Sequence, residues 1–172
     1  MQKVQIPQSV GLSAIVVIAA VFLPVLGFGF ILGDDFVHLH SHTVPFYEAY
    51  KKVFMPVTYL FYDFTKALFG LESARPYHAL NWVFHIANTG LVFAITNRLL
   101  RSLAAAAFTA LVFGLHPLQV ESVAWISGFK EVLSAFWFLL AFYFFTEQQD
   151  KPRRAYATLA LCTLAFLTKS TT

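Results

Sequence analysis

The stretch "VGLSAIVVIAAVFLPVLGFGFIL", residues 10–32, decides the fold because none of its 23 positions carries a charge. At about 1.5 Å per residue, a helix of this length is about 34 Å long and can cross a hydrocarbon core of about 30 Å. A cleaved signal peptide has a shorter apolar core followed by small residues, whereas this run ends in large residues. We therefore interpret it as a retained membrane span, with a kink expected at Pro24.

The composition of the whole chain agrees with a membrane protein. Of its 172 residues, 58% are hydrophobic and only 12% are charged, far from the balance of a soluble domain. The net charge of +3 is spread along the chain without a basic stripe, so nucleic-acid binding has no support. Cys162 is the only cysteine, which excludes an intramolecular disulfide and a thiolate metal cluster.

Four further apolar runs follow, and the connections between them are short except for the first. We predict an all-α, polytopic helix bundle that forms one transmembrane domain over residues 1–172. It has about five spans, with one or two amphipathic helices in the outer connection at 33–76. The predicted spans are residues 10–32, 77–98, 103–120, 130–147 and 154–171.

The long connection at 33–76 has its own pattern. Aromatic and aliphatic residues recur at helical intervals with charged residues between them, as in helices that lie in the membrane interface. We expect two short helices, separated at Pro56, which either cover the bundle or form a substrate groove. The apolar positions are Phe46, Tyr50, Val53, Val57, Leu60, Phe64 and Leu68.

Basic residues in the short loops predict the orientation. Lys3, Arg98, Arg101 and the "KPRR" at 151–154 all fall on one side of the predicted spans. The positive-inside rule then places the N-terminus in the cytoplasm and residues 33–76 outside.

The second predicted span carries polar residues on one face. His78, Asn81, His85 and Asn88 follow one another at intervals of three, four and three. Polar groups that face lipid are costly, so this stripe must face other helices or a hydrated cavity. Hydrogen bonds between helices are one interpretation, and a lining for a polar substrate, with His78 and Asn81 as contacts, is the other.

The outer ends of the spans gather charged residues. The first span is followed by "GDDFVHLHSH", residues 33–42, and the fourth and fifth apolar runs are too short to span without drawing Lys130 and Lys169 toward the membrane boundary. Pro117 should end the third helix at the outer side. Together these features predict a cluster of Asp34, Asp35, His38, His116, Glu121, Lys130 and Lys169.

Such a cluster suits a transferase that uses a lipid-linked sugar phosphate. One of Asp34 or Asp35 would take the proton from an acceptor hydroxyl, while the other orients the site or binds an optional divalent cation. Lys130 and Lys169 would hold the departing phosphate. No other cofactor is expected. The predicted substrate contacts are Lys130, Lys169, His116, Glu121, His78 and Asn81.

The alternating histidines give a different hypothesis. His38, His40 and His42 share a face if the chain is extended, beside two carboxylates, which would suit zinc or copper. No fourth ligand is fixed by the spacing, so we rank a metal-binding membrane protein below the transferase.

Two segments carry a family resemblance. "HPLQVESVAWISGFKEVLSAFWFLLAFYFF", residues 116–145, resembles the signature of bacterial membrane proteins with tetratricopeptide repeats that are similar to the eukaryotic transmembrane O-mannosyltransferases. Residues 54–88, with their "YH", "N", "H" and "N" pattern, resemble the same family. These proteins belong to the GT-C class of glycosyltransferases.

The resemblance implies a partial GT-C fold, a polyprenyl- or dolichyl-phosphate sugar as donor, and an acceptor hydroxyl on a glycan or a protein Ser/Thr. It implies that the acidic pair Asp34 and Asp35 is catalytic and that the protein lies in a bacterial inner membrane. Members usually carry Arg-Lys-Asp where this chain has Phe129, Lys130 and Glu131. GT-C enzymes have more spans than five, so we expect an N-terminal portion of such an enzyme. The alternative is an inactive structural or accessory subunit of a larger membrane complex.

Overall fold

The computed structural model describes residues 9–31, 35, 39, 54–146 and 152–169, and its regular elements within these ranges are all helical, which confirms the predicted fold class. Their bounds are α1 Ser9–Phe22, η1 Leu23–Gly27, α4 Pro56–Phe69, α5 Arg75–Leu100, α6 Leu103–Gly114, α7 Leu118–Ala124, η3 Ile126–Gly128, α8 Phe129–Thr146 and α9 Pro152–Thr168.

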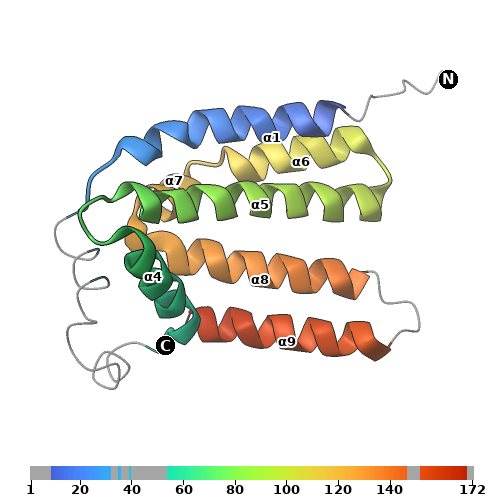
Figure 1. Ribbon diagram of the computed structural model, residues 1–172. Coiled ribbons are helices and arrows are strands. Elements are labelled where there is room, and N and C mark those ends of the chain that lie inside the picture. Colours follow the sequence, from blue (N-terminus) through green and yellow to red (C-terminus); the bar gives the residue numbers. More distant parts are fainter. Residues whose placement is uncertain (1–8, 32–34, 36–38, 40–53, 147–151, 170–172) are drawn as a thin grey trace.

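Five of the helices form a bundle. In Figure 1, α1, α5, α6, α8 and α9 lie side by side with similar axis directions, while α4 lies across one end. We call this end the α4 end; the beginnings of α5 and α8 and the end of α9 lie there too. α5 is central because it packs against α1, α6 and α8.

Helix lengths bear on the number of membrane spans. Among the described residues, α5 and the segment Ile126–Thr146 are each long and apolar enough to cross a membrane. α6 and α7 would together make a third span, bent by 64°, and Gly11–Gly27 is a shorter apolar helix. Apolar side chains such as Phe108 and Phe166 are 70% and 72% exposed, as lipid-facing residues are. The chain is a helical membrane protein, and the total of five spans stays a prediction.

Proline and glycine positions explain where helices begin and end. Pro56 lies in the first turn of α4, where a missing N–H costs nothing. Gly70, with φ of +69°, ends that helix in a conformation that side chains disfavour. The predicted third span, 103–120, is not one helix: α6 ends at Gly114 and α7 begins at Leu118, because Pro117 cannot continue a helix. α1 likewise gives way at Phe22 to the 3-10 turn that contains Pro24.

Glycines allow α1 to approach its neighbours closely. A Cβ atom added to Gly11 would lie 2.4 Å from the ring of Phe93 on α5, and one added to Gly114 would lie 2.5 Å from Ile18. Close approach at small residues is the usual means of packing helices in membranes, where the hydrophobic effect between helices is weak. The packing of α1 against α5 and α6 therefore depends on close steric fit at these two glycines.

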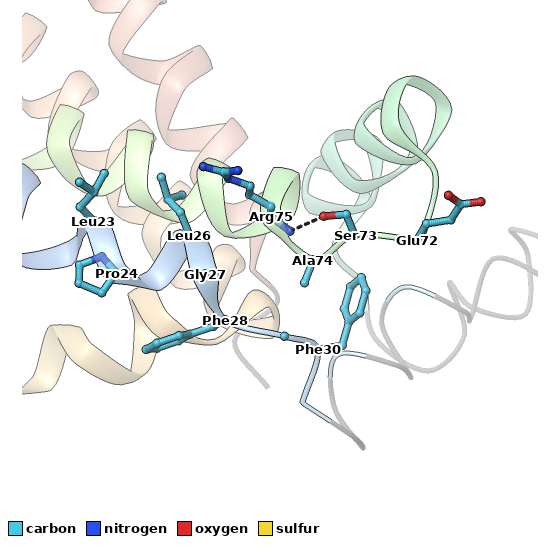
Figure 2. A pocket seen from close by; sticks show the side chains of 11 residues that line it. Leu23, Pro24, Leu26, Gly27, Phe28, Phe30, Glu72, Ser73, Ala74 and Arg75 are labelled. Carbon is cyan, nitrogen blue, oxygen red and sulfur yellow. Dashed lines mark hydrogen bonds between the residues drawn. The ribbon is translucent and has the colours of Figure 1, made fainter.

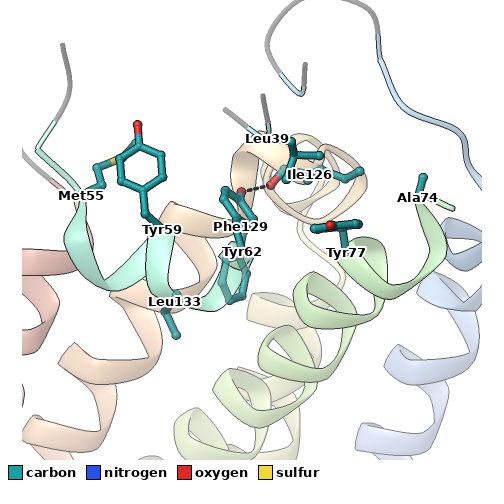
Figure 3. Packing of buried hydrophobic residues seen from close by; sticks show 9 residues of the cluster. All are labelled: Leu39, Met55, Tyr59, Tyr62, Ala74, Tyr77, Ile126, Phe129 and Leu133. Atoms are coloured by element: carbon teal, nitrogen blue, oxygen red, sulfur yellow. Dashed lines mark hydrogen bonds between the residues drawn. The ribbon is translucent and has the colours of Figure 1, made fainter. Parts of the chain in front are cut away.

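An aromatic cluster fills the α4 end. Tyr62, Tyr77 and Phe129, from α4, α5 and α8, are buried there with Leu39 and Ile126 (Figure 3). Rings of this size bury large areas and pack at tilted or edge-on angles, as Tyr62 and Phe129 do with centroids 5.7 Å apart. This cluster fixes α4 against the beginning of α8.

Candidate functional site

Asp35 is buried at the α4 end and is 1% exposed. Its Oδ2 accepts a hydrogen bond from the backbone N–H of Ile31 at 3.0 Å, and its Oδ1 accepts one from Ser127 at 2.9 Å. Both oxygens are thus occupied by backbone donors from two separate segments. Through these two hydrogen bonds the carboxylate joins the segment after η1 to the turn before α8.

The turn at residues 122–128 receives two further side chains. The Asn81 amide on α5 donates to the carbonyls of Ser122 and Val123, at 3.3 Å each, and to that of Trp125. The Tyr62 hydroxyl on α4 donates to the Ile126 carbonyl at 2.6 Å (Figure 3). Burial, with a further contribution from the nearby Asp35 charge, raises the pKa of Tyr62 well above its ordinary value, so the hydroxyl keeps its proton.

The polar stripe on α5 faces other elements. His78, Asn81, His85 and Asn88 are all buried, which confirms that the stripe does not face lipid. The contacts join α5 to the segments around it, as the hydrogen-bonding interpretation predicted. Besides the three carbonyls bound by Asn81, the partners are the carbonyls of Gly29 for His78 at 3.4 Å, Gly114 for His85 at 3.0 Å, and Val132 for Asn88 at 2.9 Å. A role of His78 and Asn81 in substrate binding stays a prediction.

A cavity of about 320 Å³ opens beside this turn. We call it the polar pocket. Glu121 and Lys130 are its charged groups that make no hydrogen bond or ion pair within the described part of the chain, and Trp125 leaves 40% of its surface exposed there. Its lining residues are Glu121, Ser122, Trp125, Ser127, Gly128, Lys130 and Glu131.

Lys169 reaches the same region from the end of α9. Its Nζ lies 2.6 Å from Oε2 of Glu131 on α8, and both side chains are about one third exposed. The pair lies at one end of a cavity of about 610 Å³ between α8 and α9, which we call the α8–α9 groove. Most of the groove is apolar, with Ala135, Phe138, Cys162, Ala165 and Phe166 in its lining. Glu131 lines both cavities, so the groove and the polar pocket adjoin.

A wider cleft of about 760 Å³ lies between η1 and the connection from α4 to α5 (Figure 2). Its charged residues are Glu72 and Arg75, and the Ser73 hydroxyl accepts a hydrogen bond from the Arg75 N–H at 3.3 Å. None of the predicted site residues that the structure describes lines this cleft. Its size alone therefore does not make it the functional site.

The structure brings part of the predicted cluster together. Asp35 contacts Ser127 at the wall of the polar pocket, Glu121 and Lys130 line that pocket, and Lys169 is paired beside it. His116 is exposed in the α6–α7 connection, where its Nδ1 accepts from the Leu118 N–H at 3.3 Å. The remaining predicted residues lie outside the described ranges: Asp34, His38, His40 and His42.

No metal site is found among the described residues, where no three His, Cys, Asp or Glu side chains come together. The histidines of the metal hypothesis fall outside these residues, so that hypothesis is not tested.

Three residues that lie at the turn or contact it were not predicted from the sequence: Tyr62, Trp125 and Ser127. Tyr62 and Ser127 support the turn through single hydrogen bonds, which leave no signal in the sequence. Trp125 stands within "VESVAWISG", and an aromatic residue in the connection between two predicted spans, with Glu121, Ser122 and Ser127 nearby, was the available signal.

Comparisons with known proteins agree with the family resemblance over part of the chain. No family model and no solved structure matches. The chain is 33% identical over 102 residues to the mouse protein O-mannosyl-transferase TMTC3 and 30% identical over 102 residues to the human protein of that name. It is 30% identical over 101 residues to human protein O-mannosyl-transferase TMTC1.

These matches cover 58% to 59% of this chain and 11% of each relative, so the chain spans about a tenth of their length. They support a relationship to the protein O-mannosyltransferases.

Proposed function

We propose that this chain is a membrane-embedded part of a glycosyltransferase that moves mannose from a polyprenyl-phosphate donor to a hydroxyl of a protein, such as that of Ser or Thr. The observation that carries the proposal is the meeting of an apolar groove and a polar pocket at Glu131, with two lysines beside them. The names of the relatives supply the sugar and the class of acceptor.

The α8–α9 groove suits the lipid tail of the donor. Its apolar lining from α8 and α9 would accept isoprene units, and its charged end would lie at the level of the phosphate. Lys169 is there, although Glu131 now neutralises part of its charge at 2.6 Å. Lys130 adds a cation with no ion-pair partner among the described residues. Two cations near the departing phosphate would stabilise the charge that develops on it.

We assign the general base to Asp34. Of the predicted acidic pair, Asp35 is buried with both oxygens bonded to backbone N–H groups, which leaves it little access to an acceptor hydroxyl. Asp35 would hold the segment that carries its neighbour. A divalent cation at the pair stays optional in this scheme.

The same arrangement supports an orientation. Arg98, Arg101, Arg153 and Arg154 come from the C-terminal end of α5 and the N-terminal end of α9, opposite the α4 end (Figure 1). By the positive-inside rule that end faces the cytoplasm, so the polar pocket faces outward. We place the protein in a bacterial inner membrane, as the resemblance implies.

The test is sugar transfer by the full-length protein in lipid nanodiscs, with radiolabelled polyprenyl-phosphate mannose and a Ser/Thr-rich peptide. Asp34→Asn should reduce the rate at least about 100-fold, the usual scale of a general base. Glu72→Gln, an exposed carboxylate of the wider cleft, is the matched control and should retain the wild-type rate.

Full activity in Asp34→Asn would remove the base assignment. The second candidate is an inactive accessory subunit. It would be favoured if the folded wild-type protein transferred no sugar and copurified in a fixed ratio with other membrane proteins. The bonded state of Asp35 is the observation that makes this second candidate worth testing.

A further inference from the structure

We infer that the polar pocket is the subsite that recognises the transferred hexose, with the Trp125 indole stacking on the sugar ring and the Glu121 carboxylate accepting hydrogen bonds from its hydroxyls. The inference rests on the proposed function. It assigns the selection of the sugar to Trp125 and gives a specific role to Glu121, a predicted substrate contact.

The main chain that carries Trp125 is fixed. Its N–H donates to the Glu121 carbonyl at 3.2 Å, and its carbonyl accepts from the Gly128 N–H at 3.1 Å and from the Asn81 side chain. Gly128 is required at this turn, since an added Cβ would lie 2.5 Å from the Ser122 carbonyl oxygen. A ring on a rigid support loses little entropy when a ligand binds to it.

The side chains around the indole match the two surfaces of a hexose. One face of a pyranose presents C–H groups, which pack on an aromatic ring, and its edge presents hydroxyl donors. Trp125 is 40% exposed into a pocket that also contains Glu121 and Lys130. Neither charged group is bonded within the described residues. The chemistry of both suits a sugar phosphate, since the carboxylate accepts from hydroxyls and the ammonium donates to hydroxyl or phosphate oxygens.

The position of the pocket agrees with the donor proposed above. A lipid tail in the α8–α9 groove would place its phosphate near Lys169, and Glu131 separates that groove from the polar pocket. The group attached to the phosphate would then extend into the polar pocket. A tryptophan that served only as an interfacial membrane residue would require no carboxylate beside it.

The experiment is equilibrium binding of methyl α-D-mannopyranoside to the full-length protein in nanodiscs, measured by saturation-transfer NMR, with sorbitol as an open-chain control. We expect the wild type and Trp125→Phe to bind the glycoside in the millimolar range without binding sorbitol. Trp125→Leu should bind it roughly tenfold more weakly, since the stacking surface is lost. Glu121→Gln should weaken binding several-fold, while the matched carboxylate variant Glu72→Gln should not change it.

Equal affinity of Trp125→Leu and wild type, or equal responses to the glycoside and to sorbitol, would overturn the inference. Since Trp125 is partly exposed, Trp125→Leu should remain folded, and Trp125→Phe provides a second variant that retains a ring. The two proposals fail separately. Sugar transfer that is unchanged in Trp125→Leu refutes the sugar subsite alone, whereas glycoside binding that depends on Trp125 without any transfer refutes the enzyme and leaves the subsite.

Discussion

Replacement of Asp35 by asparagine should destabilise the protein, because the site requires two acceptors and an amide offers one. The two donors are the N–H groups of Ile31 and Ser127, at 3.0 and 2.9 Å from different carboxylate oxygens. In Asp35→Asn one oxygen remains, while the new NH₂ group faces the other N–H. A hydrogen bond to a charged group contributes about 1.5 to 3 kcal/mol, so the free energy of unfolding should fall by about that amount.

The assay is thermal unfolding in detergent followed by intrinsic fluorescence. At about 2 to 4 °C per kcal/mol for a chain of this length, Asp35→Asn should lower the Tm by roughly 3 to 12 °C. Asp35→Ala removes both acceptors and should lower it further. Glu72→Gln, at an exposed carboxylate, should leave the Tm within about a degree of the wild-type value. A wild-type Tm in Asp35→Asn would refute the reasoning, because it would mean that the second bond contributes nothing.

This prediction affects how catalysis can be tested. A loss of transfer in Asp35→Asn would combine a chemical effect with displacement of the turn that contains Ser127 and leads into Lys130 on α8. Asp34→Asn is therefore the variant that tests the base. The activity of Asp35→Asn should be interpreted only beside its Tm.

Two further predictions concern the same turn. Asn81→Asp keeps the shape of the side chain but removes the two amide hydrogens that bond to the carbonyls of the turn. The free energy of unfolding, measured by chemical denaturation, should fall by about 1 to 3 kcal/mol. An unchanged midpoint would mean that these contacts contribute nothing to stability. Gly128→Ala places a Cβ against the Ser122 carbonyl and should lower the free energy of unfolding by about 1 to 3 kcal/mol. Gly90→Ala, in a helix with open space around that position, should raise it by up to about 1 kcal/mol. Equal unfolding midpoints for the two variants would contradict this packing.

The helical class and the buried face of α5 could be predicted because both follow from local periodicity. His78, Asn81, His85 and Asn88 repeat at helical spacing within an apolar segment, which leaves only other protein or a cavity for that face. The sequence could not decide whether that face meets other helices or a cavity. It depends on the carbonyls of distant residues such as Gly114 and Val132, which no local pattern reveals.

The different states of the acidic residues could not be predicted either. Asp35 and Glu121 both stand near predicted helix ends, yet one is buried and bonded while the other is exposed. The difference arises from long-range contacts, since Ser127 lies 92 residues after Asp35. The sequence predicted that Asp35, Lys130 and Lys169 lie at one end of the bundle, where the structure has them, but it did not identify which carboxylate supports the fold.

Residues 129 and 131 differ from the pattern of the resembling family, and their contacts suggest a physical reason. Phe129 stands where the resembling family usually has arginine, and it is fully buried against Tyr62 and Phe84 in the aromatic cluster. A guanidinium in that position would be desolvated among rings, so the core of this chain depends on an apolar residue there. Glu131, where the resembling family usually has aspartate, has an extra methylene, and its Oε2 lies 2.6 Å from Nζ of Lys169, directly after α9. Lys169, directly after α9, thus pairs with Glu131 at the groove, while Lys130 lines the adjoining polar pocket, so the proposed phosphate contact does not require a cation at position 129.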